Sequence, residues 1–506
     1  MSSWARFFAD RSLWWTLGGL EEPNAGRSEA QWHTFWSRYR KVCPKHPIFQ
    51  QKTEEQLRRT AAVVLHGDEG RSLKKSALMV LSCHSLLGKG SGVEGGAGDA
   101  DAFDAQRLNF LGHTLATRWL LAVLPRHMYA DGRAGNFQAV LAALAEDARR
   151  LCDKGVRGKD GVPFYLCVLH VVGDWPFLQK AFQYTRGFGN SSKRATTRGI
   201  PKGICHICRA DQPGYPFEDF SSAEPRWRST EDTCPAYSTP PPLLQKLLHE
   251  REAPSRLAAQ DLFHGWHLGA GKVFVSSCIA LLADFFPARS MDGRFELMTN
   301  HLRTWARAHR QQVYIRKLTR DVIGWPHATE YPTGGWSKGS TTLALLRWVI
   351  FVFGERRNAI DLGSLVHIAW LAATEANAFF SGLYRESLWI ARPRAQELAG
   401  HGLAFLHLNG RAAKVAHDQN RPLFLFMPNL HRLHHIFFFL KDQAANSDAE
   451  YALSPLAFSC QLEEDFVGRP SRISRRVDVR TSMARTLERV LMASYSKFVE
   501  CGWIVP

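Results

Sequence analysis

The amino-acid sequence predicts an α/β fold, in which a mixed sheet with elements in the order β-β-β-α-β-α is interrupted by a large all-helical insertion. Three observations carry this prediction. Residues 61–173 hold four short apolar runs, with one long amphipathic run before the last of them. Residues 265–420 show helical periodicity. The chain has 506 residues, 45% hydrophobic and 22% charged, enough for two or three domains or for one domain with a large insertion.

The first segment, residues 1–60, is rich in aromatic and basic side chains. Its run QWHTFWSRYRK predicts a helix that presents Trp32, Trp36 and Arg40 on one side. Packing of these tryptophans onto the main body is the favoured interpretation, and contact with nucleic acid is the alternative.

The predicted core begins with two strands joined by a charged turn. Residues 61–83 contain VVLHGDEGRSLKKSALMVLSC, in which two β-favouring runs flank the charges. A Gly/Asp-rich loop follows at 88–105. The run LNFLGHTLATRWLLAVLP then predicts a third strand, with a short helix as the alternative.

A helix and a central strand come next. The run FQAVLAALAEDARRLC spaces its apolar residues at the helical period and is made of strong helix formers. The run FYLCVLHVVGD is almost continuously apolar, which is typical of a strand buried on both faces. It ends at Asp174, and WPFLQKAFQYTRG is predicted to begin a helix with Pro176 in its first turn.

Composition divides the chain after the N-terminal segment. Residues 61–210 are predicted to form the first part of the sheet core, and 211–264 a proline-rich excursion with a zinc site. Residues 265–420 are the helical insertion, 421–485 the last part of the core, and 486–506 a C-terminal helix.

The chain is strongly basic, with 64 Lys and Arg against 47 Asp and Glu, for a net charge of +17. A surplus of this size indicates a polyanionic partner, of which nucleic acid is the commonest and a membrane surface the next. The runs LALLRWVIFVF and FVSSCIALLADFF are shorter than a bilayer span, and the first residues carry no secretion signal. Apart from Cys205 and Cys208, the ten cysteines are scattered singly, which favours a reducing, intracellular compartment.

Asp68 and Asp174 each follow a glycine at the end of an apolar run, in LHGD and VVGD. Carboxylates that leave neighbouring strands at one sheet edge point into a shared site, and two or three of them are the usual ligands for a pair of Mg²⁺ or Mn²⁺ ions. Two such ions, roughly 3.5–4 Å apart, clamp the attacking and leaving oxygens of a phosphoryl transfer. The alternative for either acid alone is a turn or a helix N-cap.

Cys205 and Cys208 form a CxxC pair in KGICHICRA, which has the spacing of half a zinc site. Two more ligands are needed, and the candidates are Cys234, His264 and His267. A redox-active or structurally inert pair is the alternative. Zinc is the favoured hypothesis.

Two histidine-containing motifs leave their roles open. Asp261 and His264 form DxxH at a helix start, where an N-capping Asp followed by a core histidine is the alternative. In MPNLHRLHH, His431, His434 and His435 are candidate ligands, phosphate contacts or packing residues.

An acidic run meets a run of arginines late in the chain. Glu463, Glu464 and Asp465 precede the arginines of GRPSRISRR. A third metal carboxylate beside a phosphate-binding row of arginines would have this order. The alternative is a helix whose charges complement its dipole. GWHLGAGK is not a phosphate-binding loop, because Trp266 replaces the first glycine and Val273 the Ser or Thr of that motif, and this excludes an ATPase of that class.

The chain resembles the DDE/D transposases of the CACTA, hAT and related cut-and-paste superfamilies, and transposon-derived proteins similar to them. The resemblance covers roughly residues 60–480 and rests on six motifs in one order: HGD at 66–68, GD at 173–174, CxxC at 205–208, DxxH at 261–264, PxxHxxxH at 428–435, and an acid followed by glycine at 464–468.

This resemblance implies an RNase H-like fold with catalytic acids after the first strand, after the fourth strand and on a late helix. Asp68, Asp174 and Glu464 match these acids, Asp465 is the rival of Glu464, and Glu69 competes with Asp68. The implied activity is cleavage and transfer of DNA strands, by phosphodiester hydrolysis and transesterification, with two Mg²⁺ or Mn²⁺ ions.

The remaining expectations concern zinc, DNA and location. The residues expected to hold a structural zinc ion are Cys205, Cys208, Cys234 and His264. Those expected to contact DNA phosphates are Arg71, Lys74, Lys75, Lys193, Arg194, Arg198, Arg469, Arg472, Arg475 and Arg476. The resemblance implies a nuclear protein with DNA and further copies of itself as partners and no membrane. A catalytically inactive, transposase-derived DNA-binding protein is the alternative.

Overall fold

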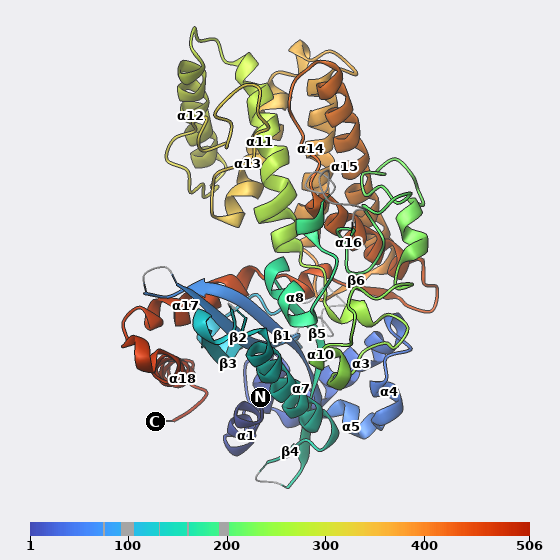
Figure 1. Cartoon of the computed structure of the whole chain (residues 1–506), viewed down its shortest axis with the longest axis vertical. Coiled ribbons are helices and arrows are strands. Elements are labelled where there is room, and N and C mark those ends of the chain that lie inside the picture. Colours follow the sequence, from blue (N-terminus) through green and yellow to red (C-terminus); the bar gives the residue numbers. More distant parts are fainter. Residues whose placement is uncertain (74–75, 93–105, 131, 159–160, 192–201, 506) are drawn as a thin grey trace, which may run out of the picture.

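A five-stranded mixed sheet forms the lower part of the molecule in the computed structural model, which describes residues 1–73, 76–92, 106–130, 132–158, 161–191 and 202–505 (Figure 1). The strands are β1 (Thr60–Arg71), β2 (Ala77–Ser85), β3 (Arg118–Pro125), β4 (Val156–Arg157) and β5 (Pro163–Gly173). Their order is β3-β2-β1-β5-β4. β1 is antiparallel to β2 and parallel to β5, and the other neighbours are antiparallel.

The four predicted strands are present, but β1 continues through the charged residues expected to form the turn and ends at Arg71. The two-residue β4 is an additional edge strand. β1 and β5 lie in the interior of the sheet, and most of their valine, leucine and alanine residues are buried on both faces. Their connection carries α7 (Ala134–Asp153), which confirms the predicted helix and packs against β5.

Helices cover both faces of the sheet, as the glycines of β1 show. A Cβ on Gly67 would lie 2.1 Å from the ring of Phe177 in α8 (Trp175–Phe182). A Cβ on Gly70 would lie 1.9 Å from the hydroxyl of Ser471 in α17 (Gln461–Ser474). Residues 67 and 70 point to opposite faces because strand side chains alternate. Asp68 shares the face of Gly70 and therefore points toward α17.

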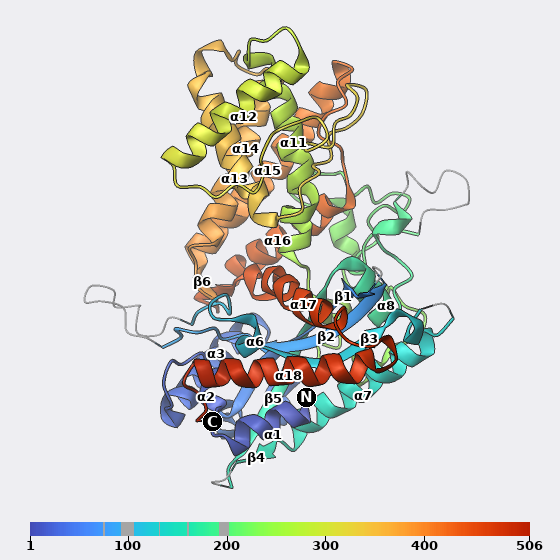
Figure 2. The same ribbon diagram turned by 90° about the vertical axis from the view of Figure 1, so that its left-hand side faces the viewer.

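The face of the sheet that α17 covers is also covered by α18 (Ser482–Glu500), which packs across β3 (Figure 2). A compact apolar cluster fills the space between these helices and the sheet, and its members include Leu78, Val80, Phe466, Val467 and Val490. This packing fixes α17, the carrier of the late acids, against the sheet.

The N-terminal segment is helical and packed, as predicted. Its helices are α1 (Ser2–Asp10), α2 (Trp14–Leu17), α3 (Ala25–Val42), α4 (Ile48–Gln51) and α5 (Glu54–Arg58). Trp32 and Trp36 of α3 are buried, and the Trp36 indole donates a hydrogen bond to the carbonyl of Thr60, 2.8 Å away. The two tryptophans therefore pack onto the core.

The predicted helical region stands above the sheet (Figures 1 and 2). Its main helices are α11 (Gly271–Leu282), α12 (Met291–Ala308), α13 (Gly339–Glu355), α14 (Leu365–Leu383) and α15 (Arg392–Asp418). The next helix, α16 (Pro428–Ala445), packs against α15 and returns the chain toward the sheet. The short helices α6 (Thr114–Thr117) and α10 (Pro242–Lys246) lie in connections.

The prediction that residues 265–420 are all helical is wrong at one point. β6 (Trp389–Ala391) pairs antiparallel with β7 (Tyr451–Leu453) and ties this region to the last part of the chain. Strands of three residues are too short to show a period in the sequence.

The expectation that no apolar run reaches the length of a bilayer span also needs correction. Among the described residues, Phe263–Phe285 forms one helical run that is long and apolar enough by composition, with 78% of its most apolar window buried inside the fold. The π-helical turn Phe263–Ala270 lengthens the run that the sequence suggested. Core helices commonly have this length and apolarity.

Candidate functional site

Asp68 and Asp174 stand at the same edge of the sheet. In the parallel pairing of β1 and β5, Gly67 lies opposite Gly173, and each glycine is followed directly by one of the two acids. Neighbouring strands are about 4.8 Å apart. The two carboxyl groups therefore leave adjacent strands at one level.

The two glycines make room for the start of α8. A Cβ on Gly67 or Gly173 would lie within 2.5 Å of the ring of Phe177. Asp174 is the N-cap of α8, and its Oδ1 accepts a hydrogen bond of 2.7 Å from the Phe177 amide. Asp174 is therefore a helix N-cap, as the alternative interpretation expects. This role fixes its carboxylate next to Asp68.

Glu464 supplies the third carboxylate from the first turn of α17. Its side chain shares a hydrogen bond with Asp68, and its Oε1 lies 3.1 Å from Nε2 of His264. We call Asp68, Asp174 and Glu464 the acid cluster.

The neighbours of Glu464 fix the rotation of α17. The Glu463 side chain is fully buried, and its Oε1 lies 2.9 Å from Nε of Arg118 and 3.2 Å from Nδ1 of His84. Asp465 instead accepts hydrogen bonds from Thr114 and Arg469. Successive helical residues are about 100° apart, so only Glu464 of the three faces Asp68.

Glu69, the competitor of Asp68, points elsewhere. Its carboxylate pairs with Lys180 of α8, while its backbone amide donates to Asp68 Oδ1 at 2.6 Å. Glu69 therefore orients Asp68 through its backbone and does not replace it.

Asp261 and His264 form a buried ion pair behind Glu464. Asp261 accepts hydrogen bonds from the amides of Phe263, His264 and Cys460, and its Oδ2 lies 2.5 Å from His264 Nδ1. The Cys460 thiol lies within 4.8 Å of this pair. Because the Asp261 oxygens already accept these donors, Asp261 acts both as a cap and as the anchor of the histidine that reaches Glu464.

In this pair Asp261 is ionised and His264 is protonated, so a positive charge lies between Asp261 and the acid cluster. Burial disfavours the charged form of His264, but Asp261 outweighs it and raises the pKa of His264 to about 10. Burial likewise opposes ionisation of Asp261, but His264 lowers its pKa to about 2. His264 is therefore an imidazolium that donates to both Asp261 and Glu464.

The acid cluster is crowded with negative charge. Burial, together with Asp174 and Glu464, raises the pKa of Asp68 well above its ordinary value. Burial also raises the pKa of Asp174. For Glu464 the hydrogen bond from His264 outweighs burial and lowers the pKa. Among the described residues, the oxygens of these three acids do not all lie within 4.8 Å of one another, as the donors of a metal-holding group would. Neighbouring carboxyl groups that resist full ionisation nevertheless gain from a bound divalent cation, which would draw them together.

A second group, which we call the Cys/His cluster, consists of Cys205, Cys208, His431 and His435. All four side chains are buried, and their ligand atoms lie within 4.8 Å of one another. Cys208 Sγ lies 3.3 Å from His431 Nε2 and 3.4 Å from His435 Nε2, and Cys205 Sγ lies 3.4 Å from His435 Nε2. The cluster could bind a metal ion such as zinc.

These distances match tetrahedral zinc. Zn–S and Zn–N bonds of about 2.3 and 2.05 Å at a tetrahedral angle place sulfur and nitrogen about 3.5 Å apart. Despite burial, contact with Cys208 and His435 lowers the pKa of the Cys205 thiol, which favours the thiolate that a metal requires.

Residues around the Cys/His cluster hold its histidines in place. The fully buried Trp227 ring lies 4.6 Å from the ring of His431 and 4.7 Å from that of His435. Glu231 Oε1 lies 3.5 Å from His435 Nδ1, the position of a partner that orients a metal-binding histidine.

Two of the predicted zinc ligands lie outside this cluster. Cys234 is exposed, and His264 is held by Asp261 and Glu464. His267, the other candidate, bonds to the Tyr384 hydroxyl, and His434 stacks on Phe438. The missing ligands come instead from α16, where residues four apart share one helix face.

Arg432 lies between the two clusters and has no equivalent among the predicted site residues. It is 2% exposed, and its Nε and Nη2 have no hydrogen-bond partner among the described residues. Its guanidinium lies 4.8 Å from the Phe188 ring, and the negative charges of Asp261 and Asp174 act on it. No local sequence pattern marks such a residue.

The predicted DNA-contacting residues fall into two sets. Lys74, Lys75, Lys193, Arg194 and Arg198 lie outside the described residues. Of the others, Arg71, Arg472, Arg475 and Arg476 are exposed at the far end of α17 and the end of β1, where Arg475 Nε donates to the Arg71 carbonyl. Arg469 is partly buried and pairs with Asp465.

Comparisons with models of known protein families and with curated proteins find no match for this chain. Its function is therefore inferred from the geometry of the two clusters.

Proposed function

We propose that this chain is a transposase-like DNA-binding protein with an RNase H-like core, in which the acid cluster holds divalent cations for cleavage and transfer of DNA strands. The observation that carries this proposal is the convergence of Glu464 on Asp68, beside the Gly67–Gly173 register that brings Asp174 to the same sheet edge.

The order of the sheet supports the RNase H-like core. Three consecutive antiparallel strands are followed by a long strand, β5, that is parallel to β1. Asp68 lies in β1 directly after the part that pairs with β5, Asp174 follows β5, and Glu464 lies on a late helix, α17. The resemblance predicts this arrangement.

The chain's own residues prepare the carboxylates before any ion binds. Asp174 is fixed as the cap of α8, Asp68 is fixed by the Glu69 amide, and Glu464 is fixed by His264. Carboxylates held in place need little reorganisation when charge develops at phosphorus. When bound, a pair of Mg²⁺ or Mn²⁺ ions would supply charge neutralisation and orient the attacking and leaving oxygens.

The exposed arginines beyond the acid cluster form a surface that can bind the phosphate backbone of DNA. Arg472 lies in the last turn of α17, Arg475 is its C-cap and Arg476 follows, and the eleven residues from Glu464 to Arg475 rise about 16 Å. Contacts of this kind position a phosphate backbone without reading its sequence. The net charge of +17 supports the same partner.

A catalytically inactive, transposase-derived DNA-binding protein is the second candidate. It is favoured by the pairing of Glu464 with the His264 cation, which competes with a metal ion for the same oxygen. The Cys/His cluster serves as a structural zinc site in either candidate.

Nicking of a supercoiled plasmid in Mn²⁺ tests the proposal. The parent protein should nick the plasmid, and Asp68→Asn, Asp174→Asn and Glu464→Gln should each reduce the rate by at least about 100-fold. Asp465→Asn, one residue from Glu464 but paired with Arg469, is the control that keeps the activity. Unchanged nicking by the three variants would overturn the proposal, and salt-sensitive DNA binding without nicking by the parent would favour the second candidate.

A further inference from the structure

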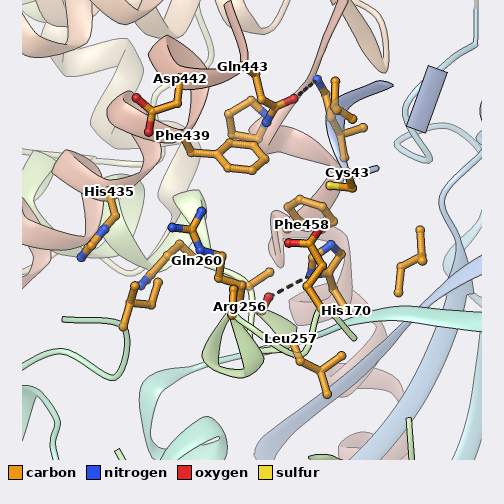
Figure 3. Close-up of a pocket in the computed structure, with 18 of the residues that line it drawn as sticks. Cys43, His170, Arg256, Leu257, Gln260, His435, Phe439, Asp442, Gln443 and Phe458 are labelled. Atoms are coloured by element: carbon orange, nitrogen blue, oxygen red, sulfur yellow. Dashed lines mark hydrogen bonds between the residues drawn. The ribbon is translucent and has the colours of Figure 1, made fainter. Parts of the chain in front are cut away.

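A pocket of about 280 Å³ borders the Cys/His cluster, because His435 of that cluster forms part of its wall (Figure 3). Its walls come from α3, from β5, from residues 249–260, from α16 and from residues 453–458. Ligand pockets in proteins have volumes of roughly 300–1,000 Å³, so an occupant of this pocket is small. Neither candidate function uses the pocket.

Apolar and aromatic side chains form much of the wall. Phe439 and Phe458 line it from two different segments, and Leu169, Ile207 and Leu257 also form part of the wall. Phe458 is held in place by the ring of His170, 4.3 Å away. An occupant therefore has an apolar or aromatic body.

Apart from the histidines, the wall has four charged side chains: Glu231, Glu250, Arg256 and Asp442. Within the described part of the chain, all but Glu250 form ion pairs. Arg256 bonds to Glu231 and to Asp232, at 3.0 and 2.7 Å. Asp442 bonds to Arg228 at 3.0 Å. Because these groups are paired with one another, they do not require a charged group on a ligand.

Glu250 is the exception. The described residues offer its carboxylate no hydrogen bond and no ion pair, although the side chain is partly buried in the pocket wall. Burial raises the pKa of Glu250 and outweighs the opposing attraction of the more distant Arg256 and Lys45 cations, neither of which bonds to this carboxylate.

The histidines of the wall cannot compensate Glu250. Burial lowers the pKa of His46 to about 3 and that of His170 to about 4, and it also lowers that of His249. His170 uses its Nδ1 to reach the carbonyl of Arg256 at 3.1 Å, which Figure 3 shows. All three rings are neutral at pH 7.

A metal ion is a poor occupant. Among the described residues, no three ligand atoms of His46, His170, His249 and Glu250 lie within 4.8 Å of one another, and Glu250 brings a single carboxylate where the acid cluster has three. An unpaired carboxylate in a largely apolar pocket suits a cation with an organic body.

We propose that this pocket binds a small organic monocation, with its ammonium group on Glu250 and its apolar or aromatic body between Phe439 and Phe458. The site is separate from the acid cluster and is independent of whether the protein cleaves DNA. It shares a wall with the Cys/His cluster through His435, so binding needs that cluster intact.

Benzylammonium and benzyl alcohol are matched probes, because they have the same shape and differ in charge at neutral pH. Isothermal titration of the full chain, with its metal bound, should show one saturable site for benzylammonium and at least tenfold weaker binding of benzyl alcohol. Glu250→Gln should abolish this difference.

Glu252→Gln is the matched control, because Glu252 is 75% exposed and pairs with Lys45 outside the pocket wall. This variant should bind benzylammonium as the parent does. Phe458→Leu keeps an apolar wall and should weaken both probes alike. The proposal is wrong if benzylammonium does not bind, if the alcohol binds equally well, or if Glu250→Gln retains the preference while its thermal unfolding matches that of the parent.

Discussion

The Cys/His cluster and the acid cluster both gather side chains from distant parts of the chain, but they differ in what surrounds the donors. The four donors of the Cys/His cluster are all buried, and Trp227 packs against both histidines. In the acid cluster the Glu464 side chain is 34% exposed and shares its oxygen with a cationic histidine. Structural metal sites are closed, whereas catalytic sites keep an open position.

The two clusters are connected through α16. This helix carries His431 and His435, and its Asn429 donates a hydrogen bond of 2.9 Å to the carbonyl of His264. His264 in turn reaches Glu464. A metal on the Cys/His cluster would therefore hold the helix that positions the histidine behind the acids, so the first site supports the geometry of the second.

Loss of the Cys/His cluster should have the largest effect. Cys208→Ser removes a thiolate from a four-donor set, and structural zinc sites in small peptides bind with about 10–16 kcal/mol. We expect loss of one zinc per chain and loss of the cooperative thermal transition, measured by elemental analysis and calorimetry. Cys234→Ser, at an exposed thiol, is the control that keeps both. Equal zinc content in the two variants would contradict the assignment.

Breaking the Asp261–His264 pair should come next. Asp261→Asn leaves a buried imidazole without its anion, and loss of one partner of a buried pair costs about 3–5 kcal/mol. The free energy of unfolding, measured with denaturant on the zinc-loaded protein without Mg²⁺ or Mn²⁺, should fall accordingly at pH 5.5. Asp153→Asn, in the exposed pair with Arg149, should change it by less than about 1 kcal/mol.

The pH dependence of this second effect follows from the two pKa shifts. The pKa of His264 is raised from 6.5 to about 10, so its contribution is complete below pH 6.5 and is lost as the pH rises through 10. The pKa of Asp261 is lowered from 3.8 to about 2, so its contribution is complete above pH 3.8 and is lost as the pH falls through 2. A cost that stays constant up to pH 11 would contradict the ion pair.

Asp68→Asn should separate function from stability. We expect Mn²⁺-dependent nicking to fall by at least about 100-fold, equivalent to about 2.7 kcal/mol in the barrier. Without Mg²⁺ or Mn²⁺, the same variant should be more stable at pH 7, because the raised pKa of Asp68 means that its ionised form is disfavoured in the fold. Thermal unfolding of the zinc-loaded protein without added Mg²⁺ or Mn²⁺ measures this rise, and a lower melting temperature would contradict the crowding of the acids.

The smallest effect should come from a single exposed arginine. Arg472→Ala removes one phosphate contact and should weaken binding to any duplex, with the salt slope reduced by about 1. Fluorescence anisotropy at several salt concentrations measures both quantities. Arg310→Ala is the comparison, because Arg310 is exposed and follows α12, a helix that Figure 1 shows far from α17. An equal loss in both variants would mean that general charge, and not this surface, binds DNA.

The sequence predicted the elements that carry local signals. The valine-rich runs, the long amphipathic helix and the Gly173–Asp174 pair at a strand end appear where expected, because period and turn chemistry are local properties. Gly67 and Asp68 lie inside β1 instead, because pairing with β2 carries this strand on to Arg71. The choice between Glu464 and Asp465 could not be made in this way. It depends on the rotation of α17, which the buried contact of Glu463 with Arg118 fixes from a distant strand.

The zinc ligands show the same limit. The CxxC pair is a local signal, and the two histidines at i and i+4 were visible as candidate ligands. Their pairing spans more than 220 residues, as the contact between Cys208 and His431 does. Nearness in sequence favoured Cys234 and His264 instead, and only the packing of α16 against the excursion decides between them.

Anomalous diffraction from one crystal grown with zinc and soaked in Mn²⁺ tests the central claim most directly. The account predicts a zinc peak among Cys205, Cys208, His431 and His435, and manganese bound by oxygens of Asp68, Asp174 and Glu464. An acid cluster without manganese, in a crystal whose Cys/His cluster is loaded, would contradict the account.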